Sequence, residues 1–407
     1  MRNKIIIVLL VLSGSLFGNS IFSFYGLPNQ FCGNDVYGLG MGETGCADLF
    51  RMNQNISNPS AMTTSNKVIY STAASMGYMW YYDDLDNTFR DDGLALPYFT
   101  VVVPIKSHRF GFNFNMVYSG NLENEELSEW TNSTGDTLEY NEINRVSSNV
   151  YKADLSYAIK NPYFNLGVSF NYYFGHKIRY WKLDFDDTDY TDTKYEIEKT
   201  FKNPGFSAGI SKKIGNISLG AAYTMFTELK GESTYKYGHS PYVDTLGLAD
   251  DILYEIPNKF AGGITWKFTE KYKVSFDGQY EMWEDTDIYN ENTYKFGLGF
   301  AYDPLSGYGK WFERIPLRFG GYVRKLPFRK NEEDIMEKAV TLGLSIPLKS
   351  PNTKIEFAAK YLTRGDKDIH GIGDRSFMIT IGISGFDVFK KKHKKNDHRD
   401  IPKADRR

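Results

Sequence analysis

Few residues in this chain have the types and spacing that catalysis or metal binding requires. The run DFDDTDYTD, Asp184–Asp192, has five carboxylates that could hold a cation, but it lacks the glycine and late glutamate of an EF-hand loop. We interpret it as a solvated external loop. The six histidines are scattered, and we find no Ser–His–Asp order and no carboxylate pair. We therefore predict that the protein is not an enzyme and holds no metal or other cofactor.

The two cysteines, Cys32 and Cys46, both precede the first expected strand. An exported protein meets an oxidising compartment, so a disulfide between them is one interpretation. Closing a loop of about 15 residues would stabilise the fold by about 3 kcal/mol in the chain-entropy model. Two free, buried thiols are the equally weighted alternative.

The N-terminus has the layout of a secretory signal peptide. Arg2 and Lys4 precede the apolar run Ile5–Leu12, and Gly18-Asn19-Ser20 offers a small-x-small cleavage site. The run is too short to span a bilayer as a helix. We therefore predict export, with residues 1–20 removed.

The elements that would position any functional side chains are strands. In Arg109–Gly120 and Tyr272–Trp283, apolar and polar residues alternate, which is typical of a strand with one apolar and one polar face. We count about fourteen such segments, which begin near Lys67, Leu94, Arg109, Arg145, Tyr163, Lys202, Ile217, Tyr254, Tyr272, Asn290, Glu313, Ile335, Asn352 and Arg375. Many are longer than the ~5–6 residues of sandwich strands, and membrane strands need about 9–11. This length favours a membrane barrel over a soluble β-sandwich.

The connections between these segments alternate in length. Pairs such as Asn161-Pro162 are short turns, whereas Asn121–Asn144, Asp184–Phe201 and Leu229–Leu253 are long and polar, which predicts short periplasmic turns and long external loops. The 30 Tyr and 29 Phe suit strands and membrane interfaces, and the net charge of −2 gives no sign of nucleic-acid binding. We predict an all-β, transmembrane antiparallel barrel of about 14 strands over residues 67–389, in the outer membrane of a diderm bacterium and in contact with its lipid.

Two further segments flank this barrel. Residues 21–66 precede the first strand and would form a periplasmic hatch that plugs the lumen. Residues 390–407 form a basic periplasmic tail that we interpret as solvated, with attraction to anionic lipid or peptidoglycan as the alternative. Charged residues fall on the strand face opposite the apolar one. From these we take four cations as candidate lumen contacts for a ligand carboxylate: Lys152, Lys267, Arg318 and Arg324.

The stretch GLGMGETGCADLFRMNQNISNPSAM, residues 38–62, resembles the N-terminal signature of the FadL-type outer-membrane transporters of long-chain fatty acids and hydrocarbons. The matching positions are Gly38, Gly40, Gly42, Gly45, Asp48, Asn58 and Pro59, and Ser60 stands where the family usually has alanine. The resemblance implies a fourteen-stranded barrel closed by this hatch. It also implies uptake of apolar small molecules that leave sideways through a distortion of the third strand, for which Gly111 and Gly120 are local candidates.

The same signature is compatible with two other functions. One is a structural or secretion-associated barrel that docks protein partners at its loops or tail. The other is a porin for polar solutes, because the lumen face carries many charges. The sequence leaves both open.

Overall fold

The computed structural model describes residues 20–52, 55–83, 88–131, 135, 137–185, 191–239, 242–304, 311–348 and 353–386. The basic tail and residues 1–19 of the predicted signal peptide lie outside them. None of the described helices is long and apolar enough to cross a membrane. The short helices are η1 (Ile21–Phe24), α2 (Val36–Leu39), η2 (Pro59–Thr64), η3 (Trp283–Asp285), η4 (Trp311–Arg314) and α3 (Lys367–His370).

The remaining elements are strands, and they follow one another around a single sheet. They are β1 (Asn29–Gln30), β2 (Ile69–Asp83), β3 (Thr88–Ala95), β4 (Tyr98–Ile105), β5 (His108–Thr131), β6 (Thr137–Ile159), β7 (Asn165–Phe185), β8 (Thr193–Ile214), β9 (Ile217–Thr224), β10 (Thr227–His239), β11 (Tyr242–Ile256), β12 (Lys259–Trp266), β13 (Tyr272–Glu281), β14 (Thr293–Tyr302), β15 (Leu317–Lys330), β16 (Glu333–Pro347), β17 (Lys354–Asp366) and β18 (Ile372–Phe386).

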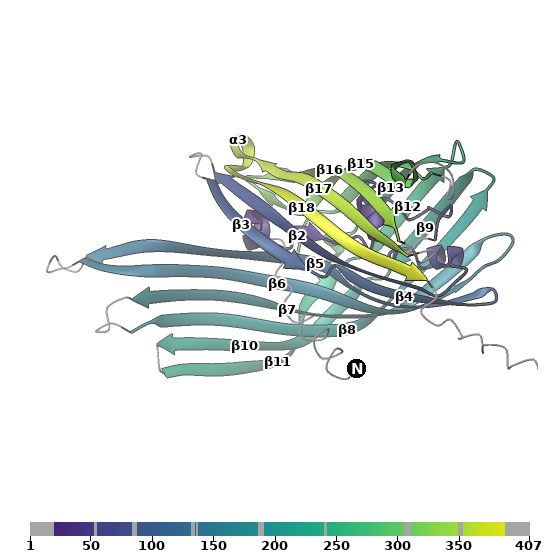
Figure 1. The fold of residues 1–407 in the computed structure, drawn as a ribbon. Helices are drawn as coiled ribbons and strands as arrows, with labels where there is room; N and C mark the ends of the chain where they lie inside the picture. Colours follow the sequence, from purple (N-terminus) through teal and green to yellow (C-terminus); the bar gives the residue numbers. More distant parts are fainter. Residues whose placement is uncertain are drawn as a thin grey trace, which may run out of the picture.

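This sheet closes on itself as a barrel, because β18 pairs with β2 from Ile372↔Asp83 to Phe386↔Ile69. β3 with β4, β9 with β10, and β11 with β12 each form one interrupted barrel strand, and β1 belongs to the N-terminal segment. The result is a closed antiparallel barrel of 14 strands, so the predicted fold class is confirmed (Figure 1). Closure gives the backbone groups of neighbouring strands partners around the ring, as a bilayer requires.

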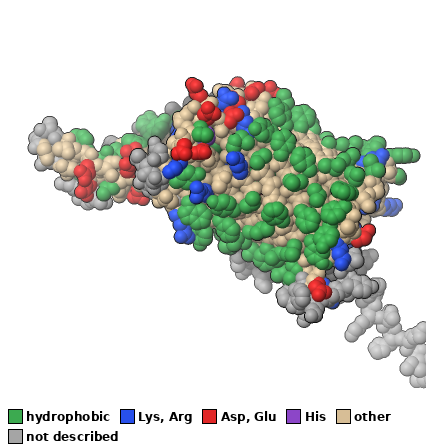
Figure 2. Space-filling model, turned by 90° about the horizontal axis from the view of Figure 1, so that it is seen from above, with side chains coloured by type: hydrophobic (Ala, Val, Ile, Leu, Met, Phe, Trp, Pro, Cys, Tyr) green, Lys and Arg blue, Asp and Glu red, His purple; other side chains and the backbone are tan. Residues whose placement is uncertain are grey.

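Alternation along the strands separates a lipid-type surface from a polar interior. In β14, for example, Phe296 and Leu298 are 46% and 56% exposed on the outer surface, whereas Lys295, which directly precedes Phe296, is buried. Apolar side chains cover much of the outer wall (Figure 2). The side chains that can make specific polar contacts therefore face the interior of the barrel.

The long external loops expected from the sequence are mostly strands, and that expectation was wrong. β5 and β6, β7 and β8, and β10 and β11 continue well past the rim formed by β2 and β3 as long hairpins (Figure 1). We call the projecting part the extended sheet: residues 122–131, 137–146, 177–185, 193–202, 230–239 and 242–251. Its sequence looked like loop because it carries polar residues on both faces, which suits strands in water.

Candidate functional site: the plugged lumen and the extended sheet

Residues 20–52 and 55–65, which we call the N-terminal segment, lie inside the barrel. Glycine permits their close approach to the wall. Gly42 has φ +67°, and a Cβ on it would lie 2.6 Å from the carbonyl oxygen of Gly321 in β15. Gly40 packs against Gly343 in β16, where a Cβ on Gly40 would lie 2.8 Å from the Cα of Gly343. Only glycine allows this backbone conformation and this spacing together.

Glu43 makes a buried charged contact between the segment and two strands of the wall. Its carboxylate forms an ion pair with Lys295 of β14 and a second one with Lys360 of β17 at 3.0 Å. The side chains of Glu43 and Lys295 are each 4% exposed. Burial alone would raise the pKa of Glu43, but the two lysines outweigh it and lower the pKa to about 2. The carboxylate is therefore ionised and holds two strands to the segment.

Asp48 anchors a second point of the segment. It accepts from Lys273 Nζ of β13 at 2.8 Å and from Arg51 Nε at 2.9 Å, and Arg51 also pairs with Asp35. The N–H groups of Gly45 and Cys46 donate to Asp277 Oδ2 at 2.7 and 2.8 Å. Charged groups of the segment and of the wall are thus hydrogen-bond or ion-pair partners of one another.

Asn58 and Pro59 begin η2 at a third point. The Asn58 carboxamide accepts from the Ser60 N–H at 3.1 Å and donates to the Cys46 carbonyl at 2.7 Å. Asn58 and Pro59 lie against Gly209 of β8 and Gly167 of β7, whose missing side chains leave them room. The six residues of the predicted motif therefore all lie at contacts within the segment or with the wall: Gly40, Gly42, Gly45, Asp48, Asn58 and Pro59.

The candidate lumen cations contact protein groups. Lys152 pairs with Asp154 at 3.2 Å. Arg318 donates to Ser345 at 2.7 Å and lies over the Tyr37 ring.

Arg324 donates to Glu337 at 3.0 Å and to Gln30 of the N-terminal segment at 3.1 Å. Lys267 follows the end of β12 and pairs with Glu270, whose side chain is 80% exposed, so the structure does not place Lys267 in the lumen. The residues that the sequence reasoning missed as anchors are Glu43, Lys273, Lys295 and Lys360. The three lysines lie on the polar face of alternating strands, and this pattern could have identified them as lumen-facing residues.

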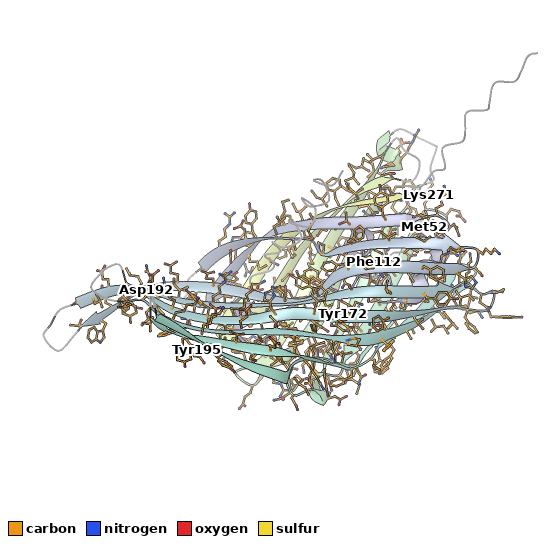
Figure 3. The ribbon with its side chains drawn as sticks, turned by 90° about the horizontal axis from the view of Figure 1, so that it is seen from below. Met52, Phe112, Tyr172, Asp192, Tyr195 and Lys271 are labelled. Carbon is orange, nitrogen blue, oxygen red and sulfur yellow. The ribbon has the colours of Figure 1, made fainter. Side chains whose placement is uncertain are left out.

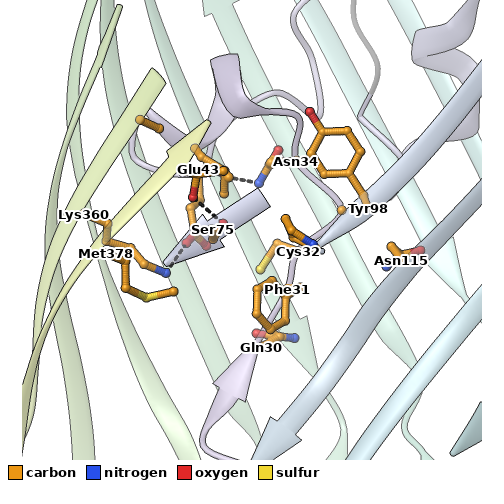
Figure 4. Close-up of a pocket in the computed structure, with 15 residues that line it drawn as sticks. Gln30, Phe31, Cys32, Asn34, Glu43, Ser75, Tyr98, Asn115, Lys360 and Met378 are labelled. Atoms are coloured by element: carbon orange, nitrogen blue, oxygen red, sulfur yellow. Dashed lines mark hydrogen bonds and ion pairs between the residues drawn. The ribbon is translucent and has the colours of Figure 1, made fainter. Parts of the chain in front are cut away.

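Small cavities remain around the N-terminal segment. One of about 30 Å³ lies between Phe31, Glu43, Tyr98 and Lys360 (Figure 4), and one of about 40 Å³ lies beside Lys152. Each has room for a few waters at most, because one water needs about 10–15 Å³ by this measure. Ligand pockets are usually about 300–1,000 Å³. Neither cavity would admit a fatty acid.

The wall is interrupted beside β5, the third barrel strand. Among the described strands, β3 pairs only with β2, and β4 pairs with β5 only as far as Tyr98↔Asn115. Beyond that point β5 has a bulge at Met116/Tyr118, between the two candidate glycines Gly111 and Gly120. β1 of the N-terminal segment pairs with β5 there, at Asn29↔Ser119 and Gln30↔Tyr118. The segment therefore covers the inner side of this interruption.

Both cysteines are buried free thiols. Cys32 accepts from Lys295 Nζ at 3.1 Å, whereas Cys46 packs with Ala222 and Ala261 of the wall. The disulfide interpretation is therefore not realised here, and the free-thiol alternative is.

Most of the acidic run 184–192 lies outside the described residues, but Asp184 and Asp192 both pair with Lys182, at 2.7 and 3.2 Å. No group of three or more His, Cys, Asp or Glu that could hold a metal ion occurs within the part of the chain that the structure describes.

The extended sheet has two chemically different faces. Its outer face carries cross-strand ion pairs: Lys236 contacts Glu196 at 2.8 Å, and Lys194 contacts the same carboxylate at 2.8 Å. On its inner face, which continues the lumen wall, Tyr195 and Tyr237 lie on one rung and are 42% and 45% exposed. Figure 3 shows Tyr195 and Asp192 on the projecting hairpins, away from the barrel-wall residues Phe112 and Tyr172.

Comparison with known proteins agrees with this architecture. A Pseudomonas aeruginosa FadL homologue has TM-score 0.61 and 14% identity, covering 88% of this chain and 99% of its own. The Pseudomonas putida toluene transporter TodX has TM-score 0.59 and 15% identity, covering 88% and 98%. The Ralstonia pickettii toluene transporter TbuX has TM-score 0.57 and 14% identity, covering 87% and 98%.

At these identities the similarity establishes the fold, and the FadL-type fold expected from residues 38–62 is confirmed. No curated protein sequence matches the chain. A family model does match, and it is the one described as BamG, over residues 1–396. That match covers nearly the whole sequence. The protein belongs to the BamG family.

Proposed function

We propose that this protein is a plugged outer-membrane barrel that docks other proteins through its extended sheet. The observation that carries the proposal is the combination of a filled lumen with a large projecting sheet. The N-terminal segment fixes the lumen closed through Glu43 and Asp48, and the two cavities beside it are of water size. An occupied lumen favours a function on the outside of the barrel.

The dimensions of the extended sheet suit a protein partner. Six strands spaced about 4.8 Å apart, each of about ten residues, give a face of roughly 25 by 33 Å, or ~800 Å². One side of a standard protein interface buries about the same area. The exposed inner-face tyrosines Tyr195 and Tyr237 are of a residue type that is enriched at interfaces. Both size and composition therefore support docking.

The edges of the sheet offer a further mode of contact. Residues 122–131 of β5 pair only with β6, and β11 pairs only with β10 among the described strands. An unpaired edge is a template for an added strand. The β5 edge carries Glu123, Glu125, Glu126 and Glu129, whose charges oppose such pairing.

Site-specific photo-crosslinking in the native host tests the proposal. A photoreactive residue at Tyr195 or Tyr237 should give the same covalent protein adduct, since both side chains share the inner face. The matched control is Phe170, which is 43% exposed on the apolar outer wall of β7 and should give no such adduct. Absence of a common adduct at the two tyrosines would reject docking on this face.

A second candidate function is uptake of hydrophobic small molecules, such as long-chain fatty acids or hydrocarbons. It is supported by the interruption between β3 and β5, where β1 covers a place at which the lumen and the bilayer would otherwise meet. Structural neighbours titled toluene transporters share the fold. Uptake of labelled oleate or toluene by cells with and without the protein tests it, and equal uptake would reject it.

A porin for polar solutes has the least support. A water-filled channel requires a continuous passage, and the N-terminal segment is held across the lumen by Glu43 and Asp48. Conductance in planar bilayers should accordingly stay at the background level.

A further inference from the structure

Three cations cluster on the inner face of the extended sheet. Lys177 of β7 is directly paired with Lys199 of β8, and Arg179 lies two residues beyond Lys177 on the same face. Directly opposed side chains have Cβ atoms about 4.5–5.5 Å apart, and i,i+2 neighbours are about 7 Å apart along a strand. The three positive charges therefore lie within the reach of one small ligand. We propose that Lys177, Lys199 and Arg179 form a binding site for a phosphate-class oxyanion.

An inner-face carboxylate lies near the cluster, but Glu142 of β6 accepts from Trp181 Nε1 at 2.9 Å and forms no ion pair with the three cations. Neither Lys177, Lys199 nor Arg179 forms an ion pair with any described residue, although each of these side chains is exposed or half-buried. Opposed like charges in a sheet destabilise it. An arrangement of this kind is stabilised when an anion binds.

On the outer face of the extended sheet, several cations have a carboxylate partner. There, Lys182 of β7 pairs with Asp184, Lys194 of β8 pairs with Glu196, and Lys236 of β10 pairs with both Glu196 and Glu198. Lys202, opposite Lys230 at the base of the sheet, is an exposed outer-face lysine without an ion pair among the described residues. The inner face differs because its three unpaired cations lie together.

The surroundings indicate what kind of molecule carries the anion. Trp181 and Tyr195 form the next same-face rung beyond Arg179 and its partner Ile197, and Tyr195 is 42% exposed. These rings give an apolar platform beside the charges. Such a platform suits an anion attached to a sugar or an acyl chain.

The cluster lies just beyond the main apolar band of the barrel wall. On the outer face of β7, His176 is the first polar residue after Tyr172 and Phe174. Lys177 is the next residue and lies on the opposite, inner face of the sheet. Three cations match a group with two or more negative charges better than a single carboxylate. Arginine adds a bidentate fork for phosphate oxygens, and lysine acts as a point charge.

The source of the phosphate is either an outer-leaflet glycolipid or a soluble molecule. Purified full-length protein in phosphate-free dodecyl maltoside would be titrated with inorganic pyrophosphate by calorimetry. In parallel, its complexes with diphosphorylated lipid A and with dephosphorylated lipid A would be counted by native mass spectrometry. Preference for the phosphorylated lipid indicates the lipid source, and pyrophosphate binding without it indicates a soluble source. Both results support the site.

Variants make the assignment specific. Lys177→Gln with Lys199→Gln should weaken binding by at least ~10-fold, because each removes a charge-assisted hydrogen bond. Lys177→Arg with Lys199→Arg should retain it, which separates charge from folding. The matched control is Lys194→Gln, on the outer face of β8, which should leave binding unchanged. The proposal is overturned if neither phosphate probe binds saturably, or if the Gln pair binds as tightly as wild type.

The inference goes beyond the proposed docking function and does not depend on it. The binding assays use the purified protein without a partner. A failure of photo-crosslinking at Tyr195 and Tyr237 would leave the anion result unaffected, and the reverse also holds.

Discussion

Replacing Glu43 by Gln removes a buried negative charge that Lys295 and Lys360 share. Removing one partner of a buried pair costs about 3–5 kcal/mol, because the remaining charge is left without compensation. The pKa gives an independent figure. A shift from the ordinary 4.5 to about 2 corresponds to about 3 kcal/mol of stabilisation of the folded state. The two routes agree, so we expect the N-terminal segment to loosen substantially.

Native-state hydrogen exchange measures this loosening at defined amides. The Gly42 N–H donates to Thr341 Oγ1 at 2.8 Å, and the Gly45 and Cys46 N–H groups donate to Asp277. A loss of about 3 kcal/mol should lower protection at these amides by roughly 100-fold. Amides in the strand ladders should change little, since the barrel closes through β18 and β2 without the segment.

Two further variants isolate the cause. Glu270→Gln removes an ion pair with Lys267 in which the glutamate is 80% exposed, and it should not change protection of the segment. Adding Lys295→Met to Glu43→Gln removes one of the two lysine charges that Glu43 compensates, and it should restore part of the exchange protection of the segment. Protection in Glu43→Gln within about threefold of wild type would refute the claim that this contact holds the segment.

Three other perturbations test the same account. Gly42→Ala should release the segment, because φ is +67° and a Cβ would lie 2.6 Å from a wall carbonyl oxygen. The control Gly215→Ala has φ +57° but no atom within 4 Å of its Cβ, so it should lower the free energy of unfolding by only about 1 kcal/mol. Thermal unfolding of the two variants compares these effects. Since the folded pKa of Glu43 is depressed to about 2, its contribution is complete above pH 4.5 and is lost as the pH falls toward 2; exchange protection that is flat across this window would contradict it. Cys32 and Cys46 should resist maleimide until the protein is unfolded, and reductant should not shift unfolding; rapid native labelling would show that the thiols are accessible.

The barrel could be predicted from sequence because alternation is a local property. Phe296, Leu298 and Phe300 face outward at period two, and the same pattern recurs in every barrel strand that crosses the apolar band. The extended sheet was missed because its strands lack an apolar face. Lys194, Glu196 and Lys236 stabilise it through cross-strand ion pairs, and their pattern in the sequence resembles that of a polar loop.

The lumen contacts could be predicted only in part. The motif glycines and Asp48 were identified through the family resemblance. Their partners Lys273 and Gly321 are more than 200 residues away, and sequence spacing does not reveal which wall positions they meet. Lys267 was assigned to the lumen by extending the alternation one residue past the end of β12, into a turn where the alternation no longer sets the side-chain direction.

Native mass analysis of the protein, purified gently from its own host, tests the central claim most directly. The docking account predicts a stoichiometric protein partner that is lost when residues 122–131 and 137–146 of the extended sheet are shortened to a tight turn. It also predicts no enrichment of fatty acids or hydrocarbons over a detergent-only control. Enrichment of such ligands without a partner would contradict docking and favour uptake instead.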